Sequence, residues 1–444
     1  MKYVLLLLGT FLLPAAFAQN PVILSQREQA KVIDDILDDR LRTVLPALMR
    51  REGFDMWIVM SREYNEDPVI KTLLPATWMA ARRTTMLVMF DRGEGKEMEY
   101  LAVARYDVGK VFKRAWDPDQ QPDQWAQLAS IVQERDPKKI GINKAEHYGH
   151  ADGLTANDYE QLVKSLNKKL HPRIASAERL AVSWLETRSE KEMVLYPQIC
   201  RIAHEIIEEG FSDRVIQPGV TTTEDVVWWY REKISALQLD TWFHPSVSIQ
   251  RSEPDALFTK RPQPVVIQPG DLLHVDFGIT YLRLNTDTQQ HAYILKAGET
   301  DAPDYLKKAL REGNALQDIL TGNFALNKTG NQILADSRKQ AISQGLTPSI
   351  YTHPIGYHGH AAGTTIGQWD MQQGVPGSGD YTLHYNTAYS IELNVTTHIN
   401  EWKKDIQIKL EEDGFFDGAG KFRYIDGRQK ELIVIPRRST LNGD

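Results

Sequence analysis

The chain has very little cysteine, since Cys200 is the single one among 444 residues. A lone cysteine excludes an intrachain disulfide framework and any zinc site built from several cysteines. Basic charge is not in excess either, because 52 Lys and Arg residues stand against 59 Asp and Glu residues, a net charge of −7. A nucleic-acid-binding protein would present a clustered basic face, so we expect no nucleic-acid partner. The 42% hydrophobic content excludes a disordered chain and predicts a packed core.

Long apolar runs are also lacking. The run at residues 4–13 is too short to cross a bilayer core of roughly 30 Å as a helix. Lys2 precedes this run and Ala16-Phe17-Ala18 follows it, which is the order of a secretory signal peptide with a small-x-small cleavage site. We therefore predict a signal peptide at residues 1–18, a secreted or periplasmic protein, and no membrane partner after cleavage. An N-terminal membrane anchor or a buried helix is the alternative interpretation.

Two capping boxes mark where major helices begin. Ser25 with Glu28 starts one helical pattern, and Ser189 with Glu192 starts another, with Pro197 inside the second. The region between them mixes strands and helices, which predicts a small α/β domain over residues 19–185 without a catalytic constellation. We place a second domain at residues 186–444. Short β-rich runs predict strands at 56–60, 84–90, 100–103 and 140–142, and further helices are expected near 223–237, 304–320 and 329–344.

Three segments of the second domain alternate apolar and polar residues, at 273–278, 390–395 and 406–411. A period of two places the polar residues of a strand on one face of its sheet. Asp276, Glu392 and Glu411 lie on those polar faces, one in each segment. A half-buried sheet with a wet face is the simpler interpretation of any one segment. Three such segments, each with a carboxylate, indicate a site.

Two further features could complete that site. Asp287 follows Asp276 by eleven residues, and a strand, a short turn and a returning strand would bring both carboxylates to the same end. His353, His358 and His360 fall within eight residues that also contain two glycines. The first and last of these histidines can point into one cavity across a glycine turn.

The order Asp276, Asp287, His353, Glu392 and Glu411 resembles the ligand order of the pita-bread metallopeptidases. That family includes aminopeptidase P, prolidase and methionine aminopeptidase, with creatinase as a relative without metal. Residues 353–360 also resemble the family signature H-x-(I/L)-G-x-x-x-H. The resemblance covers about residues 186–436. It implies an α/β (α+β) fold class, in which a curved antiparallel sheet flanked by helices follows a smaller creatinase-like α/β domain.

The resemblance also implies a site for two divalent metal ions held by these five residues. Four carboxylates would balance the charge of two such ions, and an oxygen-rich set with one imidazole suits Mn²⁺ first, with Co²⁺, Zn²⁺ or Fe²⁺ as alternatives. A hydroxide that bridges the metals would attack the scissile carbonyl. By the same resemblance Glu392 shuttles the proton and His360 stabilises the tetrahedral intermediate. His360, Lys409 and His358 are assigned to substrate binding.

Several positions depart from the family pattern. No histidine lies at 255–259, about seventeen residues before the first ligand, although His244 could take its place in space. Gln290 stands where many members have arginine, and Lys409 replaces another arginine. These changes leave the metal ligands intact and put Xaa-Pro specificity in question. Glu412 is an alternative last ligand, but the alternation favours Glu411.

We therefore expect an exported dimetal hydrolase of short peptides, an Xaa-Pro aminopeptidase or an Xaa-Pro dipeptidase. One alternative is a dimetal hydrolase of a non-peptide amide or ester. Another is a non-catalytic binding protein that keeps the pita-bread cleft. The N-terminal domain is expected to shape the cleft or to form a homodimer, as in the resembling enzymes.

Overall fold

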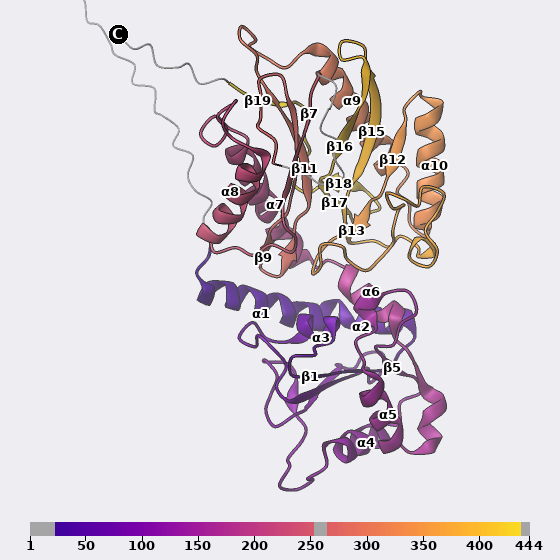
Figure 1. Cartoon of the computed structure of the whole chain (residues 1–444). Coiled ribbons are helices and arrows are strands. Elements are labelled where there is room, and N and C mark those ends of the chain that lie inside the picture. Colours follow the sequence, from indigo (N-terminus) through magenta and orange to yellow (C-terminus); the bar gives the residue numbers. More distant parts are fainter. Residues whose placement is uncertain (1–22, 253–263, 437–444) are drawn as a thin grey trace, which may run out of the picture.

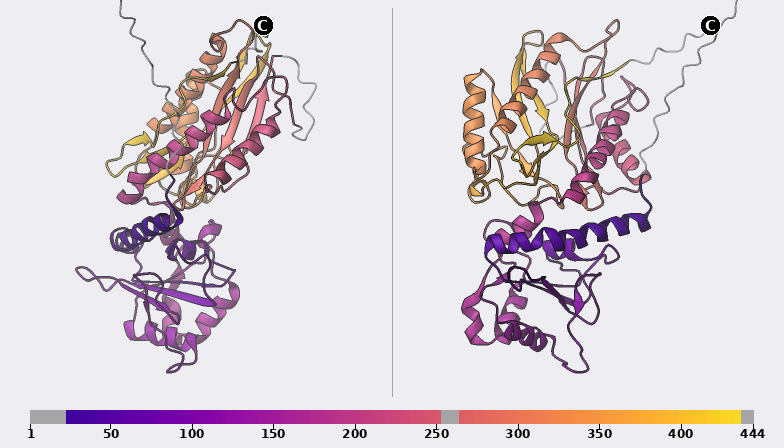
Figure 2. Two further views of the ribbon diagram at one scale, coloured as in Figure 1. Left: turned by 90° about the vertical axis from the view of Figure 1, so that its left-hand side faces the viewer. Right: turned by 180° about the vertical axis from the view of Figure 1, so that it is seen from behind.

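The computed structural model describes residues 23–252 and 264–436, which form an N-terminal lobe and a C-terminal lobe (Figure 1). The predicted signal peptide lies outside the described residues. Helix α1 (Gln26–Thr43) lies between the two lobes, as the side views also show (Figure 2). The boundary predicted near residue 186 coincides with the end of α6 (Glu178–Glu186). Of the helices described, none has the length and apolar character needed to span a bilayer.

The N-terminal lobe is a six-stranded mixed sheet with helices on both faces. Along β1, Trp57 and Val59 pack with one group of helices, whereas Ile58 and Met60 pack against the other face. This alternation explains why the strand is apolar throughout, because both of its faces are covered. The strand order is β4 (Lys113–Arg114), β3 (Glu99–Val103), β2 (Thr84–Phe90), β1 (Met56–Arg62), β5 (Ile140–Ile142) and β6 (Ile174–Ser176). Around it lie α2 (Leu45–Glu52), α3 (Pro68–Leu73), α4 (Gln124–Arg135), α5 (Ala156–Ser165), and the 3₁₀ turns η1 (Gly149–Ala151) and η2 (Lys168–Arg173).

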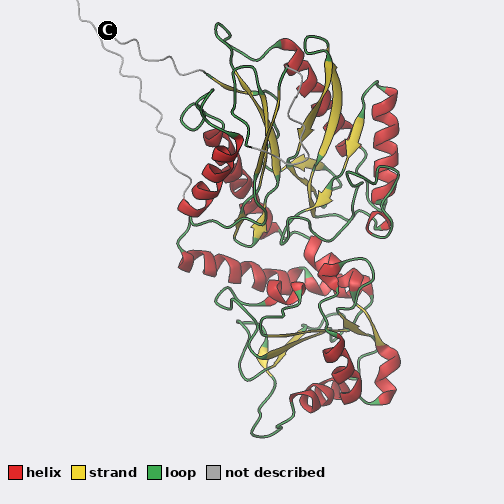
Figure 3. Cartoon of the chain, in the orientation of Figure 1, coloured by secondary structure: helices red, strands yellow, loops and turns green. Residues whose placement is uncertain are grey.

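The described part of the C-terminal lobe contains three larger, mainly antiparallel sheets and a small two-stranded one between two pairs of helices (Figure 3). The first sheet has the order β19 (Ile433–Ile435), β11 (Thr288–Ile294), β8 (Leu272–Phe277) and β7 (Ser246–Gln250), with β19 parallel to β11. The second has the order β12 (Pro348–Ile350), β15 (Leu393–Ile399) and β16 (Lys404–Leu410). The third has the order β13 (His353–Pro354), β14 (Thr387–Ser390), β17 (Asp413–Phe416) and β18 (Phe422–Tyr424).

Each helix pair of this lobe covers a different part of the sheet system. Helix α7 (Glu190–Gly210) packs against β8 and β11, and α8 (Thr223–Ala236) packs against β7. Helix α9 (Asp304–Gly322) packs against β15 and β16, and α10 (Gly330–Ser343) packs against α9 and β12. A backbone bridge between Gln289 and Glu411 joins the first sheet to the second. The remaining short elements are β9 (Thr280–Tyr281), β10 (Leu284–Asn285) and η3 (Ser378–Asp380).

The predicted fold class is confirmed, and both capping boxes are formed at the starts of α1 and α7. Helix α7 continues through Pro197, which lies within its first turns. The prediction of one strand over residues 390–395 is wrong, because the chain changes hydrogen-bonding partner at Glu392. Ser390 pairs with Asp413 in the third sheet, whereas Leu393 pairs with Leu410 in the second. Glu392 therefore lies in a two-residue seam where the strands switch sheets.

Candidate metal centre and active site

The two aspartates are brought together by paired strands. Asp276 lies near the end of β8 opposite Gln289 of β11, and Asp287 directly precedes β11. A small β9–β10 hairpin connects the strands and turns at Leu282 and Arg283, whose φ angles of 53° and 66° are left-handed. A two-residue hairpin loop needs such positive φ values, and ordinarily takes them from Asn or Gly. The predicted return of both carboxylates to one end is thus observed.

His353 lies at the centre of the cluster. Its Nε2 atom is 3.5 Å from Glu411 Oε1, 3.6 Å from Asp287 Oδ2 and 3.9 Å from Glu392 Oε2. Its Nδ1 atom donates to the carbonyl of Pro354 at 2.9 Å. That bond places the proton on Nδ1 and directs the Nε2 lone pair at the carboxylates, as for a metal-binding imidazole.

The ligand atoms converge closely enough to hold metal ions. Three groups have ligand atoms within 4.8 Å of one another: Asp276, Asp287 and Glu411; His353, Glu392 and Glu411; and Asp287, His353 and His360. Two atoms in these groups, Asp287 Oδ1 and His353 Nε2, are buried and have no hydrogen-bond partner among the described residues. A buried polar atom without a partner is costly, so cations at this position would satisfy groups that the protein leaves open. The residues present therefore fit a metal centre.

The electrostatics of the cluster agree with that fit. Burial, followed by the charge of Glu411, raises the pKa of Asp276 to about 7 and the pKa values of Asp287 and Glu392 well above their ordinary range. Burial alone lowers the pKa of His353, but Glu411 and Glu392 outweigh it and raise that pKa to about 9. Carboxylates crowded together without a cation hold protons in this way. Divalent cations would remove the repulsion that causes it.

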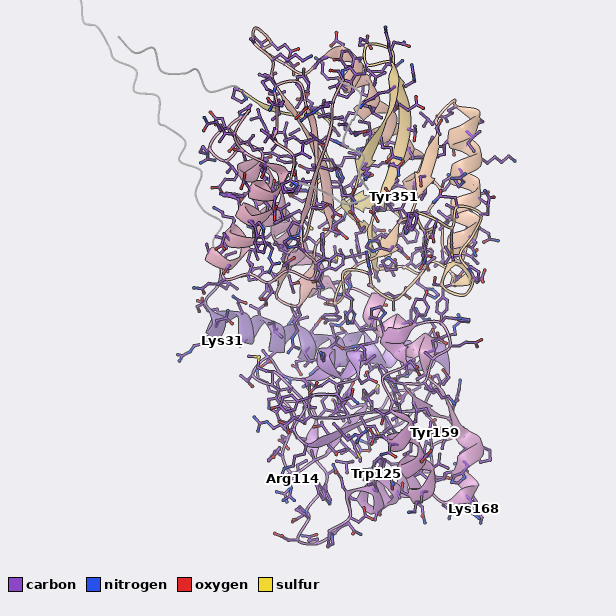
Figure 4. The ribbon with its side chains drawn as sticks, in the orientation of Figure 1. Lys31, Arg114, Trp125, Tyr159, Lys168 and Tyr351 are labelled. Atoms are coloured by element: carbon purple, nitrogen blue, oxygen red, sulfur yellow. The ribbon has the colours of Figure 1, made fainter. Side chains whose placement is uncertain are left out.

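The cluster lies in the wall of a large cleft of about 1320 Å³. His360 lines this cleft, with its ring centroid 4.7 Å from that of His353 and 5.0 Å from that of Trp242. Lys409 lines it as well. Tyr351, which Figure 4 labels in the C-terminal lobe, completes the wall beside the cluster and accepts a hydrogen bond at its hydroxyl from Asn394. The remaining lining is mostly polar, with Ser246, Ser248, Ser349, Thr365, Asn394, Thr396 and Gln407, and with Trp369 and Asp370 at exposed positions.

His358 is not brought to the cleft wall. Its ring packs against that of His150 in the N-terminal lobe, with the centroids 4.5 Å apart. Burial, followed by the charge of His150, lowers the pKa of His358 to about 4. Its assignment to substrate binding therefore has no support from its position.

Glu412 and His244 both lie apart from the metal cluster. Glu412 points away from it, and its carboxylate accepts hydrogen bonds from His204 at 2.7 Å and from Gln290 at 3.0 Å. This arrangement leaves Glu411 as the candidate ligand, as the alternation predicted. His244 bonds to Arg231 at 3.1 Å and packs on Trp228, both on α8. Residues 255–259, where the family has a histidine, lie outside the described residues.

Three residues that contact or flank the ligands were missed at the sequence level. Gln289 donates to Glu392 and Glu411, Ser390 donates to Glu411, and Tyr351 lines the cleft next to Glu392. Gln289 follows Asp287 by two residues, so strand alternation does place it on the same face. A side-chain amide is not a typical metal ligand in such a set, so residue type alone does not mark Gln289 as part of the site.

Comparison with known proteins identifies the family. Residues 195–415 match the model of metallopeptidase family M24, and the predicted metallopeptidase is thereby confirmed. A search of curated protein sequences finds no significant match to the chain. Solved structures resemble it over nearly their whole length at low sequence identity.

The X-Pro aminopeptidase of Thermotoga maritima MSB8 superposes with a TM-score of 0.61 at 15% identity, over 87% of this chain and 99% of that one. An Xaa-Pro dipeptidase from Bacillus anthracis gives 0.54 at 16% identity, over 92% and 100%. The N-terminal domain of FACT complex subunit SPT16 from Eremothecium gossypii gives 0.57 at 14% identity, over 91% and 99%. These likenesses show a shared fold. Together with the pita-bread architecture, the match over residues 195–415 identifies the C-terminal lobe as a member of metallopeptidase family M24.

Proposed function

We propose that this protein is an exported dimetal exopeptidase that cleaves short peptides at the bond before proline. The observation that carries the proposal is the convergence of four carboxylates and one imidazole around buried, unpartnered atoms of Asp287 and His353. A binding protein would gain nothing from keeping such mutually repelling groups in its core. Metal ions, with Mn²⁺ as the first candidate and Co²⁺, Zn²⁺ or Fe²⁺ as alternatives, would offset the repulsion among these carboxylates.

The roles of the side chains follow from their places in the cleft. Divalent ions held by Asp276, Asp287, His353, Glu392 and Glu411 would supply Lewis acidity and an activated water. Glu392 lines the cleft beside His353, so it is placed to take up a proton and return it to the leaving amine. His360 lies beside His353 and is placed to donate a hydrogen bond to the developing oxyanion. Such a donor contributes about 2.7–4 kcal/mol.

The size and charge of the cleft favour peptides longer than a dipeptide. Its volume of about 1320 Å³ exceeds the roughly 300–1,000 Å³ that is usual for small-molecule pockets. Lys409 supplies a positive side chain in the wall that can pair with a substrate carboxylate or carbonyl. An Xaa-Pro aminopeptidase is therefore the first choice, and an Xaa-Pro dipeptidase the second.

A cleavage screen of the chain from residue 19 onward tests the activity. The metal-stripped protein, reloaded separately with Mn²⁺, Co²⁺, Zn²⁺ or Fe²⁺, would be offered Xaa-Pro-Xaa tripeptides, Xaa-Pro dipeptides and matched Xaa-Ala peptides. We expect cleavage of Xaa-Pro-Xaa that needs metal and is lost in Asp287→Asn. The proposal would be refuted if the wild-type protein bound no transition metal, or if the metal-loaded protein cleaved none of these peptides.

A second candidate is hydrolysis of a non-peptide amide or ester at the same metal centre. His244 favours it, because this histidine faces α8 and so does not replace the upstream histidine of the family. A substrate panel separates the two, since a strong preference for non-peptide amides or esters would support the second candidate.

Export is tested independently of activity. The full chain would be expressed in a bacterial host, and the N-terminus of the periplasmic product would be sequenced. We expect it to begin at Gln19. A double variant, Ala16→Arg with Ala18→Arg, is expected to stay uncleaved.

A further inference from the structure

Gln289 links two of the proposed metal ligands. Its Nε2 atom donates to Glu392 Oε1 and to Glu411 Oε2, each at 2.6 Å. We propose that Gln289, itself held by His274, is a positioning residue that fixes the orientation of both glutamates for metal binding. This inference rests on the proposed function and adds two residues that act on the metal centre without being ligands.

The chemistry of the groups determines how the amide is oriented. In the metal-bound state both carboxylates are ionised and can only accept hydrogen bonds, so the NH₂ group of Gln289 must face Glu392 and Glu411. The amide oxygen then faces His274, whose Nε2 lies 2.7 Å away and donates to it. The Nδ1 atom of His274 is left as an acceptor for the hydroxyl of Ser248, 3.3 Å away. Each polar atom of the Gln289 side chain therefore has a partner, in a residue that is only 3% exposed.

These bonds decide which carboxylate oxygens remain for metal ions. Glu392 binds Gln289 through Oε1, so its Oε2 atom is the one that faces His353. Glu411 binds Gln289 through Oε2 and Ser390 through Oε1, which fixes the plane of its carboxylate. A neutral amide can hold two like charges together without adding a cation that would compete with the metals. The two glutamates are thus oriented before any ion arrives.

His274 acts on the centre only through this amide. It lies on the same face of β8 as Asp276 and is buried, with its ring 5.2 Å from that of His291. No hydrogen bond or ion pair joins His274 to the five proposed ligands among the described contacts; its partners are Ser248 and Gln289. Its effect on metal binding must therefore vanish when Gln289 can no longer transmit it.

Metal affinity, measured without substrate, tests the proposal. Calorimetric titration of the stripped protein with MnCl₂ would compare wild type, Gln289→Leu, His274→Leu and the double variant. We expect Gln289→Leu to bind Mn²⁺ about 10–100-fold more weakly, the usual effect of losing a partner of a metal ligand. We expect His274→Leu to weaken binding less, and the double variant to match Gln289→Leu, because the two residues act in series. Gln407→Leu, an exposed change on the same cleft wall, is the matched control for affinity.

Each outcome bears on the proposal. A Gln289→Leu protein that binds Mn²⁺ within twofold of wild type overturns it, as does a double variant whose losses are simply additive. If Gln289→Leu does not fold, as judged by circular dichroism, the same comparison is made with Gln289→Asn, which keeps the amide but shortens its reach, and weaker binding is again expected. Wild-type protein that binds no Mn²⁺ would instead refute the proposed function itself.

Discussion

A buried ion cluster between the two lobes should be among the most sensitive points of the molecule. Glu192 of α7 accepts from Arg40 of α1 at 2.6 Å and from Arg188 at 2.9 Å, and these side chains are at most 1% exposed. Both guanidinium groups also lie over the ring of Tyr357, at 5.1 and 4.8 Å. The change Glu192→Gln keeps the size of the side chain and removes the only negative charge that these contacts supply.

The expected decrease in the free energy of unfolding follows from the number of guanidinium groups that lose their negatively charged partner. Removing one partner of a buried ion pair costs about 3–5 kcal/mol, because the other charge stays buried and uncompensated. Glu192 serves two guanidinium groups, so we expect a loss near the upper end of that range. Burial raises the pKa of Glu192, but Arg188 and Arg40 outweigh it and hold that pKa below its usual value. The stability it contributes is therefore present above about pH 4 and declines as the pH falls further.

Urea unfolding followed by tryptophan fluorescence would measure the effect. Trp184 is a suitable local probe, because its ring lies 4.3 Å from the guanidinium of Arg40. Glu190→Gln, on the exposed side of the same first turn, is the matched control and should change stability by less than about 0.5 kcal/mol. If Glu192→Gln unfolds within about 1 kcal/mol of wild type at pH 7, our reasoning about this cluster is refuted.

Three further predictions concern the metal site and its surroundings. Chelation should lower thermal stability, and Mn²⁺ at about 100 times its Kd should restore about 2.7 kcal/mol in a melting experiment; equal melting points of stripped and loaded protein would contradict this. Gly359→Ala should cost about 1–3 kcal/mol by overpacking and lower kcat, because its Cβ would lie 2.1 Å from Trp242; unchanged kinetics and stability would count against this packing of the loop. Burial lowers the pKa of His204, but Glu412 and Asp426 outweigh it and raise that pKa to about 10. The stability advantage of wild type over His204→Gln should thus be full below about pH 6.5 and be lost by pH 10, at no more than about 1.4 kcal/mol per pH unit; an advantage that grows with pH would exclude the ion pair.

Local sequence patterns predicted much of the candidate site. Alternation along 406–411 placed Glu411 and Lys409 on one face. The structure puts Lys409 in the cleft wall and Glu411 in the metal cluster, whereas Glu412 faces His204. The spacing of Asp276 and Asp287 similarly predicted a strand pair, because the length of a hairpin determines where its strands return. Such features depend on residues that are close in the sequence, so they can be predicted from the sequence of one chain.

Features that depend on distant partners were not predictable in this way. The break of the strand at Glu392 arises because β14 and β15 pair with different strands, and no local pattern encodes that choice. The pairing of His204 with Glu412 joins residues 208 positions apart. His358 follows Gly356 by two residues in a loop, where strand parity no longer applies, and it contacts His150 of the other lobe instead of the cleft.

The seam where strands switch sheets has a consequence for how the C-terminal lobe holds together. Glu392 and Glu411 lie in matching two-residue breaks, between paired positions of the second and third sheets, while Asp276 and Asp287 come from the first. The ligands meet there, where single backbone links such as the Gln289–Glu411 bridge and the bond from Ile391 N–H to the Glu412 carbonyl join the sheets. Ions bound at this point would cross-link the three sheets, because their ligands come from all three. The metal–ligand bonds needed for catalysis would therefore also stabilise the lobe. Loss of metal should then weaken the contacts between the sheets before the strand pairing within any one sheet is lost.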